Sequence, residues 1–175
     1  MEAPDSRTPP VVSVVARSGT GKTTVLESLL PALKALGVRV AVVKHHHHTS
    51  SFDTPGKDTF RLAEAGADLV VGVSPVQVAT FSRESRSENL DEVIARHCAG
   101  YDLVLTEGYK RGDYPKIEVH RMERSTELLC EYDELLALVT DGHWDTDVPQ
   151  YDLNDAEGLA ELLALWLESK SPEPL

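Results

Sequence analysis

The chain has 175 residues, 41% of them hydrophobic, which is enough for one domain with a buried core. Its 29 acidic and 17 basic side chains give a net charge of −12, which disfavours a general nucleic-acid surface because DNA or RNA would be repelled. Two cysteines without disulfide spacing, and no apolar run near the ~20 residues of a membrane span or typical of a signal peptide, lead us to expect a cytoplasmic protein that binds no membrane.

The composition changes at both ends of the chain. Residues 1–10 are polar and proline-bearing, which predicts a disordered lead-in, and residues 170–175 predict a frayed tail. Between them, residues 11–169 alternate between strand-like and helix-like patterns. We expect a single α/β domain of the P-loop NTPase class, with a mostly parallel sheet flanked by helices and a β-hairpin insertion.

An apolar strand at residues 11–16 runs into a turn of small residues that ends Gly-Lys-Thr-Thr. In such a loop the backbone N–H groups close around phosphate oxygens, and the two loop glycines leave room for that approach. Lys22 would contact the terminal phosphates and the Thr23 hydroxyl would ligate Mg²⁺, although Ala16 stands where the usual pattern has its first glycine. The competing interpretation is a glycine-rich helix cap that binds no ligand. The expected nucleotide-binding residues here are Ser18, Gly19, Thr20, Gly21, Lys22, Thr23 and Thr24.

The rest of the chain alternates between the two periodicities. Helical spacing of apolar residues predicts a helix over residues 24–36, with a kink at Pro31, and a buried strand follows over residues 38–43. This strand–helix–strand order predicts parallel pairing. Further along we expect a helix ending at Ala65, a hairpin of residues 68–73 and 76–81, a helix over 88–99, strands over 102–106, 116–120 and 135–140, and a last helix capped by Asn154 or Asp155.

The strand over residues 102–106 ends at Glu107. A parallel sheet places the residue at such a strand end beside the phosphate loop, across from Lys22. There Glu107 could hold Mg²⁺ through water or orient the attacking group, so it is a candidate catalytic and metal-binding residue. Alone, a glutamate at a strand end would be ordinary surface chemistry, and the upstream loop favours the functional interpretation.

Four consecutive histidines, residues 45–48, follow Lys44 at the end of a predicted strand. In an extended segment only alternate side chains share a face, so only alternate histidines could meet on one Zn²⁺ or Ni²⁺ ion. The alternatives are a solvated loop and a contact with phosphate or another acidic ligand. Lys44 itself could point into the same pocket.

Residues 52–61 (FDTPGKDTFR) allow two interpretations. One is a Pro-Gly turn that enters a helix with charged flanks. The other is a mobile loop that closes on a γ-phosphate, with Asp53 near Mg²⁺ and Lys57 or Arg61 meeting an anionic substrate. The sequence alone leaves both open.

Together these segments resemble one family, the molybdopterin-guanine dinucleotide biosynthesis protein B (MobB) family. The resemblance covers residues 11–167 and depends mainly on the histidine run and the later motifs, because thousands of NTPases share the phosphate loop. The matching segments are SGTGKTT (18–24), VVKHHHH (42–48), DTPGKDTFR (53–61), AGAD (65–68), LTEGYK (105–110) and PKIEV (115–119).

The resemblance implies a homodimeric protein that binds GTP with Mg²⁺ and is at most a slow GTPase. Members of this family assist the guanylyltransferase that attaches GMP to molybdopterin, so that enzyme is the implied partner, with molybdopterin as a further candidate. Carried over to this chain, residues 19–24 would bind phosphates, Thr23 the magnesium, and Glu107 and Asp53 would be the acidic groups near the metal. The edge of the hairpin at residues 68–81 is the expected dimer contact.

The residue that would read the base is less clearly marked. The usual Asn-Lys-x-Asp guanine reader is absent, and Asp141 is the nearest candidate, because a carboxylate can accept the guanine N1 and N2 hydrogens. Two other functions remain open. One is a small-molecule kinase of the same fold, which would need an arginine-rich lid; Arg121 and Arg124 are too sparse to establish such a lid, and Lys110, Arg111 and Lys116 leave it open. The other is a metal-delivery GTPase that uses the histidine run.

Overall fold

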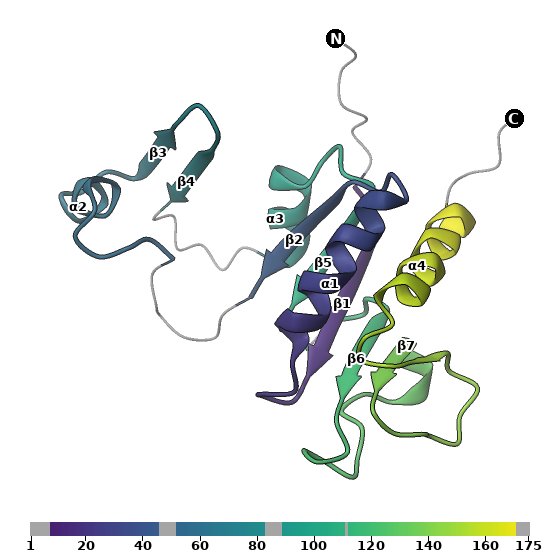
Figure 1. Ribbon diagram of the computed structural model, residues 1–175. Coiled ribbons are helices and arrows are strands. Elements are labelled where there is room, and N and C mark those ends of the chain that lie inside the picture. Colours follow the sequence, from purple (N-terminus) through teal and green to yellow (C-terminus); the bar gives the residue numbers. More distant parts are fainter. Residues whose placement is uncertain (1–7, 46–51, 83–88, 111, 171–175) are drawn as a thin grey trace, which may run out of the picture. The chain divides into compact units, whose positions relative to one another are not determined.

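The computed structural model describes residues 8–45, 52–82, 89–110 and 112–170 (Figure 1). The chain divides into two compact units. One contains the described residues up to His45 and from Glu92 onward, and the other contains the described residues between 46 and 91. The expectation of one nucleotide-binding domain over residues 11–169 stays a prediction.

The first unit is built on a six-stranded sheet with the order β2-β5-β1-β6-β7-β8. Each neighbouring pair in it is parallel, which confirms the predicted α/β class. The sequence patterns missed the last strand, which has only two residues and therefore no readable alternation. The strands are β1 (Val11–Ala16), β2 (Val40–Lys44), β5 (Leu103–Glu107), β6 (Lys116–His120), β7 (Leu135–Thr140) and β8 (Gln150–Tyr151).

The described part of this unit contains α1 (Lys22–Ala35), α4 (Ala156–Lys170) and α3 (Leu90–His97) from Glu92 onward. Helices α1 and α4 lie side by side on the sheet (Figure 1). The α1 helix continues through Pro31. Asp155 rather than Asn154 caps α4, because its Oδ1 accepts the Gly158 N–H at 2.9 Å, whereas Asn154 donates to Asp152.

The core lies between the sheet and these two helices. All six residues of β1 are buried, as expected for a central strand of a parallel sheet that is covered on both faces. Leu29 and Leu33 of α1 and Leu163 of α4 are fully buried, and each such side chain contributes about 1.5–3 kcal/mol relative to an exposed one. This packing fixes the end of β1 and the start of α1, where the phosphate loop lies.

The second strand differs from its prediction as a buried strand over residues 38–43. It begins only at Val40, because the Val38 N–H still closes the end of α1 by donating to the Leu33 carbonyl at 3.0 Å. It is also the edge strand of the described sheet, and Val42 is 45% exposed. An edge strand pairs with a neighbour on one side only, so its side chains stay partly exposed even where the sequence is apolar.

Residues 1–7 and 171–175 of the expected lead-in and tail lie outside the described residues. Before β1, Pro9 is already buried, and the Pro10 carbonyl accepts the Val104 N–H at 2.9 Å. No helix among the described residues is long and apolar enough to cross a membrane.

The second unit contains α2 (Asp58–Glu64) and the antiparallel pair β3 (Leu69–Val73) and β4 (Val78–Ser82), which confirms the predicted hairpin. Its turn is wider than expected, because the Ser74 hydroxyl accepts the N–H groups of Val76 and Gln77. The second strand therefore begins two residues later than predicted.

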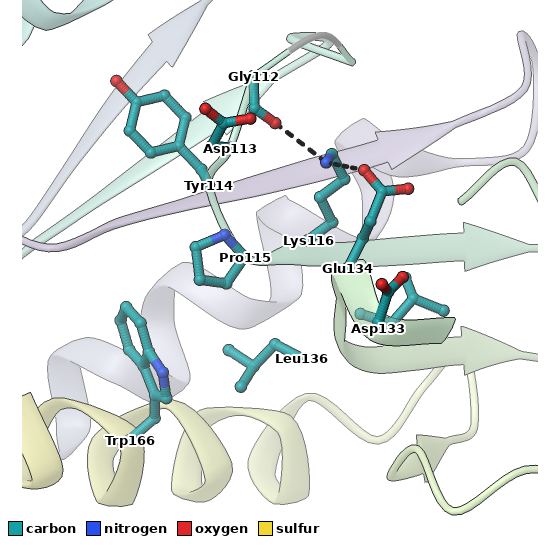
Figure 2. A pocket seen from close by; sticks show the side chains of 10 residues that line it. Gly112, Asp113, Tyr114, Pro115, Lys116, Asp133, Glu134, Leu136 and Trp166 are labelled. Atoms are coloured by element: carbon teal, nitrogen blue, oxygen red, sulfur yellow. Dashed lines mark hydrogen bonds and ion pairs between the residues drawn. The ribbon is translucent and has the colours of Figure 1, made fainter. Parts of the chain in front are cut away.

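An ion pair between a buried lysine and an exposed glutamate joins β6 to the turn before β7 in the first unit. The Lys116 side chain is 4% exposed, and its Nζ donates to the Gly112 carbonyl at 3.1 Å and to Glu134 Oε1. Figure 2 shows this pair beside a cavity of about 400 Å³, with Leu136 and Trp166 on another wall. The hydrogen bond from Lys116 lowers the pKa of Glu134. Because a buried ammonium needs acceptors, this contact stabilises the unit.

Replacing Glu134 with Gln should lower the free energy of unfolding by about 1–3 kcal/mol at pH 7, because Lys116 loses its charged acceptor. The folded-state pKa of Glu134 is lowered, so the contribution is present above the unfolded pKa of ~4.3 and lost as the pH falls through the lowered pKa. Urea unfolding at pH 7 and at acidic pH measures both effects. The exposed neighbour Asp133 provides the control Asp133→Asn, and an equal loss in the two variants would contradict the assignment.

Candidate functional site

The phosphate loop connects β1 to α1. Gly19 and Gly21 have φ values of 75° and 101°, a left-handed conformation that favours glycine. Thr20 is 2% exposed and its hydroxyl donates to the Arg17 carbonyl at 2.7 Å, which closes the turn. Ser18, Gly19, Thr23 and Thr24 are exposed, so the loop surface is open to a ligand at the helix N-terminus.

A carboxylate faces this loop from the neighbouring strand. Glu107 ends β5, and its Oε1 accepts a hydrogen bond from the Thr23 hydroxyl at 3.0 Å. Its Oε2 lies 3.3 Å from Lys44 Nζ, at the end of β2. The Glu107 side chain is only 13% exposed. The parallel register produces this arrangement, because Glu107 lies beside Val14 of β1 and beside Lys44 of β2.

One residue before Glu107, a hydrogen bond between side chains joins β5 to β1. The Thr106 hydroxyl donates to the Ser13 hydroxyl at 2.9 Å, and both residues are buried. A buried hydroxyl pair of this kind satisfies both groups without water. It fixes β5 against β1 one residue before Glu107.

The charges of two other lysines act on Lys22 in this loop. Burial lowers the pKa of Lys22; the charge of Glu107 partly offsets this, and the charges of Lys110 and Lys44 lower it further. This crowding of positive charge costs free energy unless an anion is present. The electrostatic free energy of the site is therefore more favourable with a bound polyphosphate than without one.

The donor set also fits a magnesium ion. A threonine hydroxyl and a carboxylate 3.0 Å apart offer the hard oxygen ligands that Mg²⁺ prefers, either directly or through water. Bound there with a triphosphate, the ion would neutralise charge on the phosphates. Glu107 and Thr23, both predicted as metal-site residues, are thus brought together by the fold.

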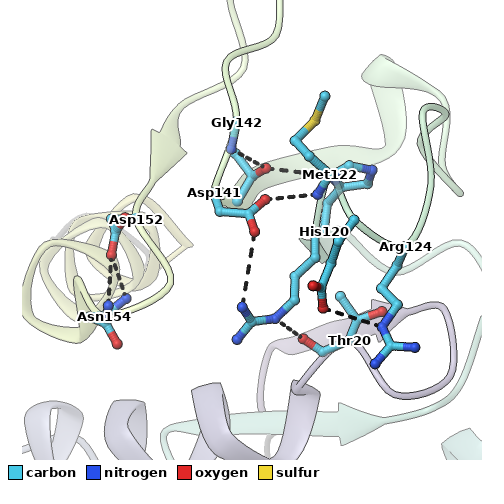
Figure 3. A network of polar contacts seen from close by, with 11 residues as sticks. Thr20, His120, Met122, Arg124, Asp141, Gly142, Asp152 and Asn154 are labelled. Atoms are coloured by element: carbon cyan, nitrogen blue, oxygen red, sulfur yellow. Dashed lines mark hydrogen bonds and ion pairs between the residues drawn. The ribbon is translucent and has the colours of Figure 1, made fainter.

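Asp141 lies at the end of β7, on the other side of the loop (Figure 3). Its Oδ1 accepts the Met122 N–H at 2.8 Å, and its Oδ2 lies 4.0 Å from Arg121 Nη1. Arg121 in turn donates from Nε to the Thr20 carbonyl at 3.0 Å. The predicted base reader is therefore connected to the phosphate loop through an arginine.

Two other predicted features, Asp53 and most of the histidine run, do not belong to the described part of the first unit. Asp53 belongs to the second unit, where its Oδ1 accepts the Thr54 N–H at 2.8 Å and the Thr59 hydroxyl at 3.2 Å, so its role at the metal stays a prediction. Residues 46–48 of the histidine run lie outside the described residues. Among those that are described, no group of three or more His, Cys, Asp or Glu side chains could hold a metal ion.

A sequence model of one family matches most of the chain that builds this site. The family is described as "Molybdopterin guanine dinucleotide synthesis protein B" (MobB), and the match covers residues 11–141, from β1 to Asp141. The chain belongs to the MobB family.

MobB relatives match the chain over nearly its whole length. The molybdopterin-guanine dinucleotide biosynthesis adapter protein of Escherichia coli (strain K12) is 36% identical over 168 residues, which covers 93% of this chain and 95% of the relative. The adapter protein of Haemophilus influenzae is 37% identical over 160 residues, which covers 90% of this chain and 89% of the relative. A crystal structure of molybdopterin-guanine biosynthesis protein B (mobB) aligns with a TM-score of 0.73 and 31% identity, over 89% of this chain and 99% of that chain.

Sequence reasoning identified the loop of this MobB protein and Glu107 but missed the contact that Arg121 makes. Arg121 was considered only as part of a kinase lid. The available signal was its position, directly after a strand that a parallel sheet could place next to β1. A side chain at that strand end reaches the same sheet edge as the phosphate loop.

Binding of inorganic tripolyphosphate should take up protons at alkaline pH, because the anion stabilises the charged form of Lys22. The pKa of Lys22 is lowered in the free protein, so affinity is full below that pKa and falls as the pH rises through it. Calorimetry in buffers of different ionisation enthalpy measures the uptake. Lys110→Met, which keeps Lys22, should retain the uptake, and its loss in that variant would show that Lys110 is the group that titrates.

Proposed function

We propose that this protein is a GTP-binding adapter of molybdopterin guanine dinucleotide biosynthesis. The observation that carries the proposal is the Thr23 hydroxyl held 3.0 Å from Glu107 at the start of α1, beside Lys22. These three groups provide what a magnesium–triphosphate complex needs: a hydroxyl and a carboxylate for the ion and a lysine for the phosphates. The adapter names of the relatives support the pathway.

Within this proposal, the chain supports binding more than rapid hydrolysis. Glu107 is already engaged by Thr23 and Lys44, so its carboxylate orients the metal-binding hydroxyl. Asp53 is the second acidic candidate for the metal and for orienting water. We expect at most slow GTP hydrolysis, in the cytoplasm, with the guanylyltransferase as partner and molybdopterin as a further candidate ligand.

A homodimer is part of the same proposal, and the hairpin supports it. Leu69, Val71 and Val73 alternate along β3 and are 56%, 50% and 77% exposed. An exposed apolar stripe along one strand of a two-stranded sheet is a typical interaction surface, and the strand edges can pair with another chain. A second copy of this chain is the partner that we propose for it.

Calorimetry of GTP with and without Mg²⁺ tests the nucleotide site. Lys22→Ala should abolish measurable binding and leave the fold intact, because burial makes the charged lysine unfavourable in the free protein, as its lowered pKa indicates. Glu107→Gln should remove most of the increase in affinity that Mg²⁺ gives, since the amide is a weaker ligand. Glu123→Gln, at a side chain that is 67% exposed, is the matched control. Wild-type affinity in Lys22→Ala would overturn the proposal.

A second measurement tests the base. Asp141→Asn keeps the Oδ1 acceptor for Met122 but places an amide where a carboxylate would accept two guanine hydrogens. Loss of such charged hydrogen bonds should weaken the binding of GTP by about 1.5–3 kcal/mol and leave the affinity for ATP nearly unchanged. The control is Asp145→Asn, an exposed carboxylate of the same loop. An unchanged GTP-over-ATP preference in Asp141→Asn would exclude Asp141 as the guanine reader.

A further inference from the structure

Arg121 is the residue that lies directly against the phosphate loop from β6. Its Nε donates to the Thr20 carbonyl at 3.0 Å. A Cβ placed on Gly21 would be in ordinary van der Waals contact with this guanidinium, 3.7 Å from its Nη2 and 3.9 Å from its Nε, so the guanidinium lies close to the loop at Gly21. Because Thr20 is buried and closes the turn onto Arg17, this contact bears on the shape of the whole loop.

The other end of the guanidinium meets Asp141. The Nη1–Oδ2 distance of 4.0 Å is long for an ion pair, and the two side chains are 36% and 35% exposed. The second carboxylate oxygen is anchored to the Met122 N–H at 2.8 Å. Asp141 is thus fixed by one oxygen, while the other is held only weakly and is accessible to a ligand (Figure 3).

Together these contacts form a chain of three residues across three neighbouring elements. It runs from Asp141 at the end of β7, through Arg121 after β6, to Thr20 in the loop after β1. Each link joins charged or polar groups at the carboxyl edge of the sheet. The chain connects the part of the site that would contact a base with the part that would hold phosphates.

We propose that Arg121 is a positioning residue that couples base recognition at Asp141 to the phosphate loop. This inference depends on the proposed function, with guanine at Asp141. A base that donates to Oδ2 fixes the carboxylate, the fixed carboxylate holds the guanidinium on Thr20, and the triphosphate then meets a loop that is already shaped. Such preorganisation makes the base and the triphosphate bind more tightly together than separately.

A double-mutant cycle on the full chain tests this coupling. The variants are Arg121→Gln, Asp141→Asn and the double variant, and the ligands are GTP and inorganic tripolyphosphate, which has no base. With GTP, the loss in the double variant should be at least about fivefold smaller than the product of the single losses. With tripolyphosphate, the losses should multiply within about twofold, because no base fixes Asp141.

The matched control is Arg124→Gln. Its guanidinium also lies near the loop, 3.9 Å from where a Cβ on Gly19 would stand, but its Nε pairs with Glu123 at 3.5 Å. It should show no coupling to Asp141. Thermal unfolding of each free variant checks the fold, and Arg121→Lys, which keeps the charge without the forked donors, replaces Arg121→Gln if that variant does not fold.

The outcomes separate the inference from the proposed function. Independent losses with GTP, or equal coupling with GTP and with tripolyphosphate, would overturn the role of Arg121 and leave GTP binding intact. A wild-type protein that binds no GTP would overturn both. Coupling that appears only when the ligand carries guanine supports the inference, because a merely structural tie would act on both ligands.

Discussion

The site depends on one constraint, the parallel alignment of β5, β1 and β6. Parallel strands bring their carboxyl ends to one edge of the sheet, so Glu107, the phosphate loop and Arg121 meet although they are far apart in sequence. The buried Ser13–Thr106 hydroxyl pair holds β1 to β5 just before that edge. A shift of one residue in this register would turn Glu107 to the other face of the sheet.

The proposed anion site requires a local excess of positive charge in an acidic protein. The chain carries a net charge of −12, yet Lys22, Lys44 and Lys110 gather around the loop, and burial lowers the pKa of the first. Glu107 balances part of this charge and is held by Thr23 and Lys44 in return. The site is therefore electrostatically incomplete in a way that a polyphosphate with a divalent cation would complete.

Most of the first unit could be predicted because its signals are local. The buried run of β1, the loop glycines and the helical spacing of α1 each reflect one short segment. The edge position of β2 could not, because it depends on how many neighbours the strand has, and β8 could not, because two residues show no alternation. The same holds for Arg121: its contact with Thr20 spans 101 residues of sequence, and a single arginine after a strand has many possible partners.

The separation between local and total charge has a kinetic consequence. Within a Debye length of the surface, about 8 Å at physiological ionic strength, the acidic side chains repel an approaching polyanion, whereas farther out their field is screened. Only near the loop do the lysines dominate. Added salt therefore screens an unfavourable approach as well as a favourable contact, so the association rate of an anionic ligand should depend on ionic strength less steeply than its affinity does.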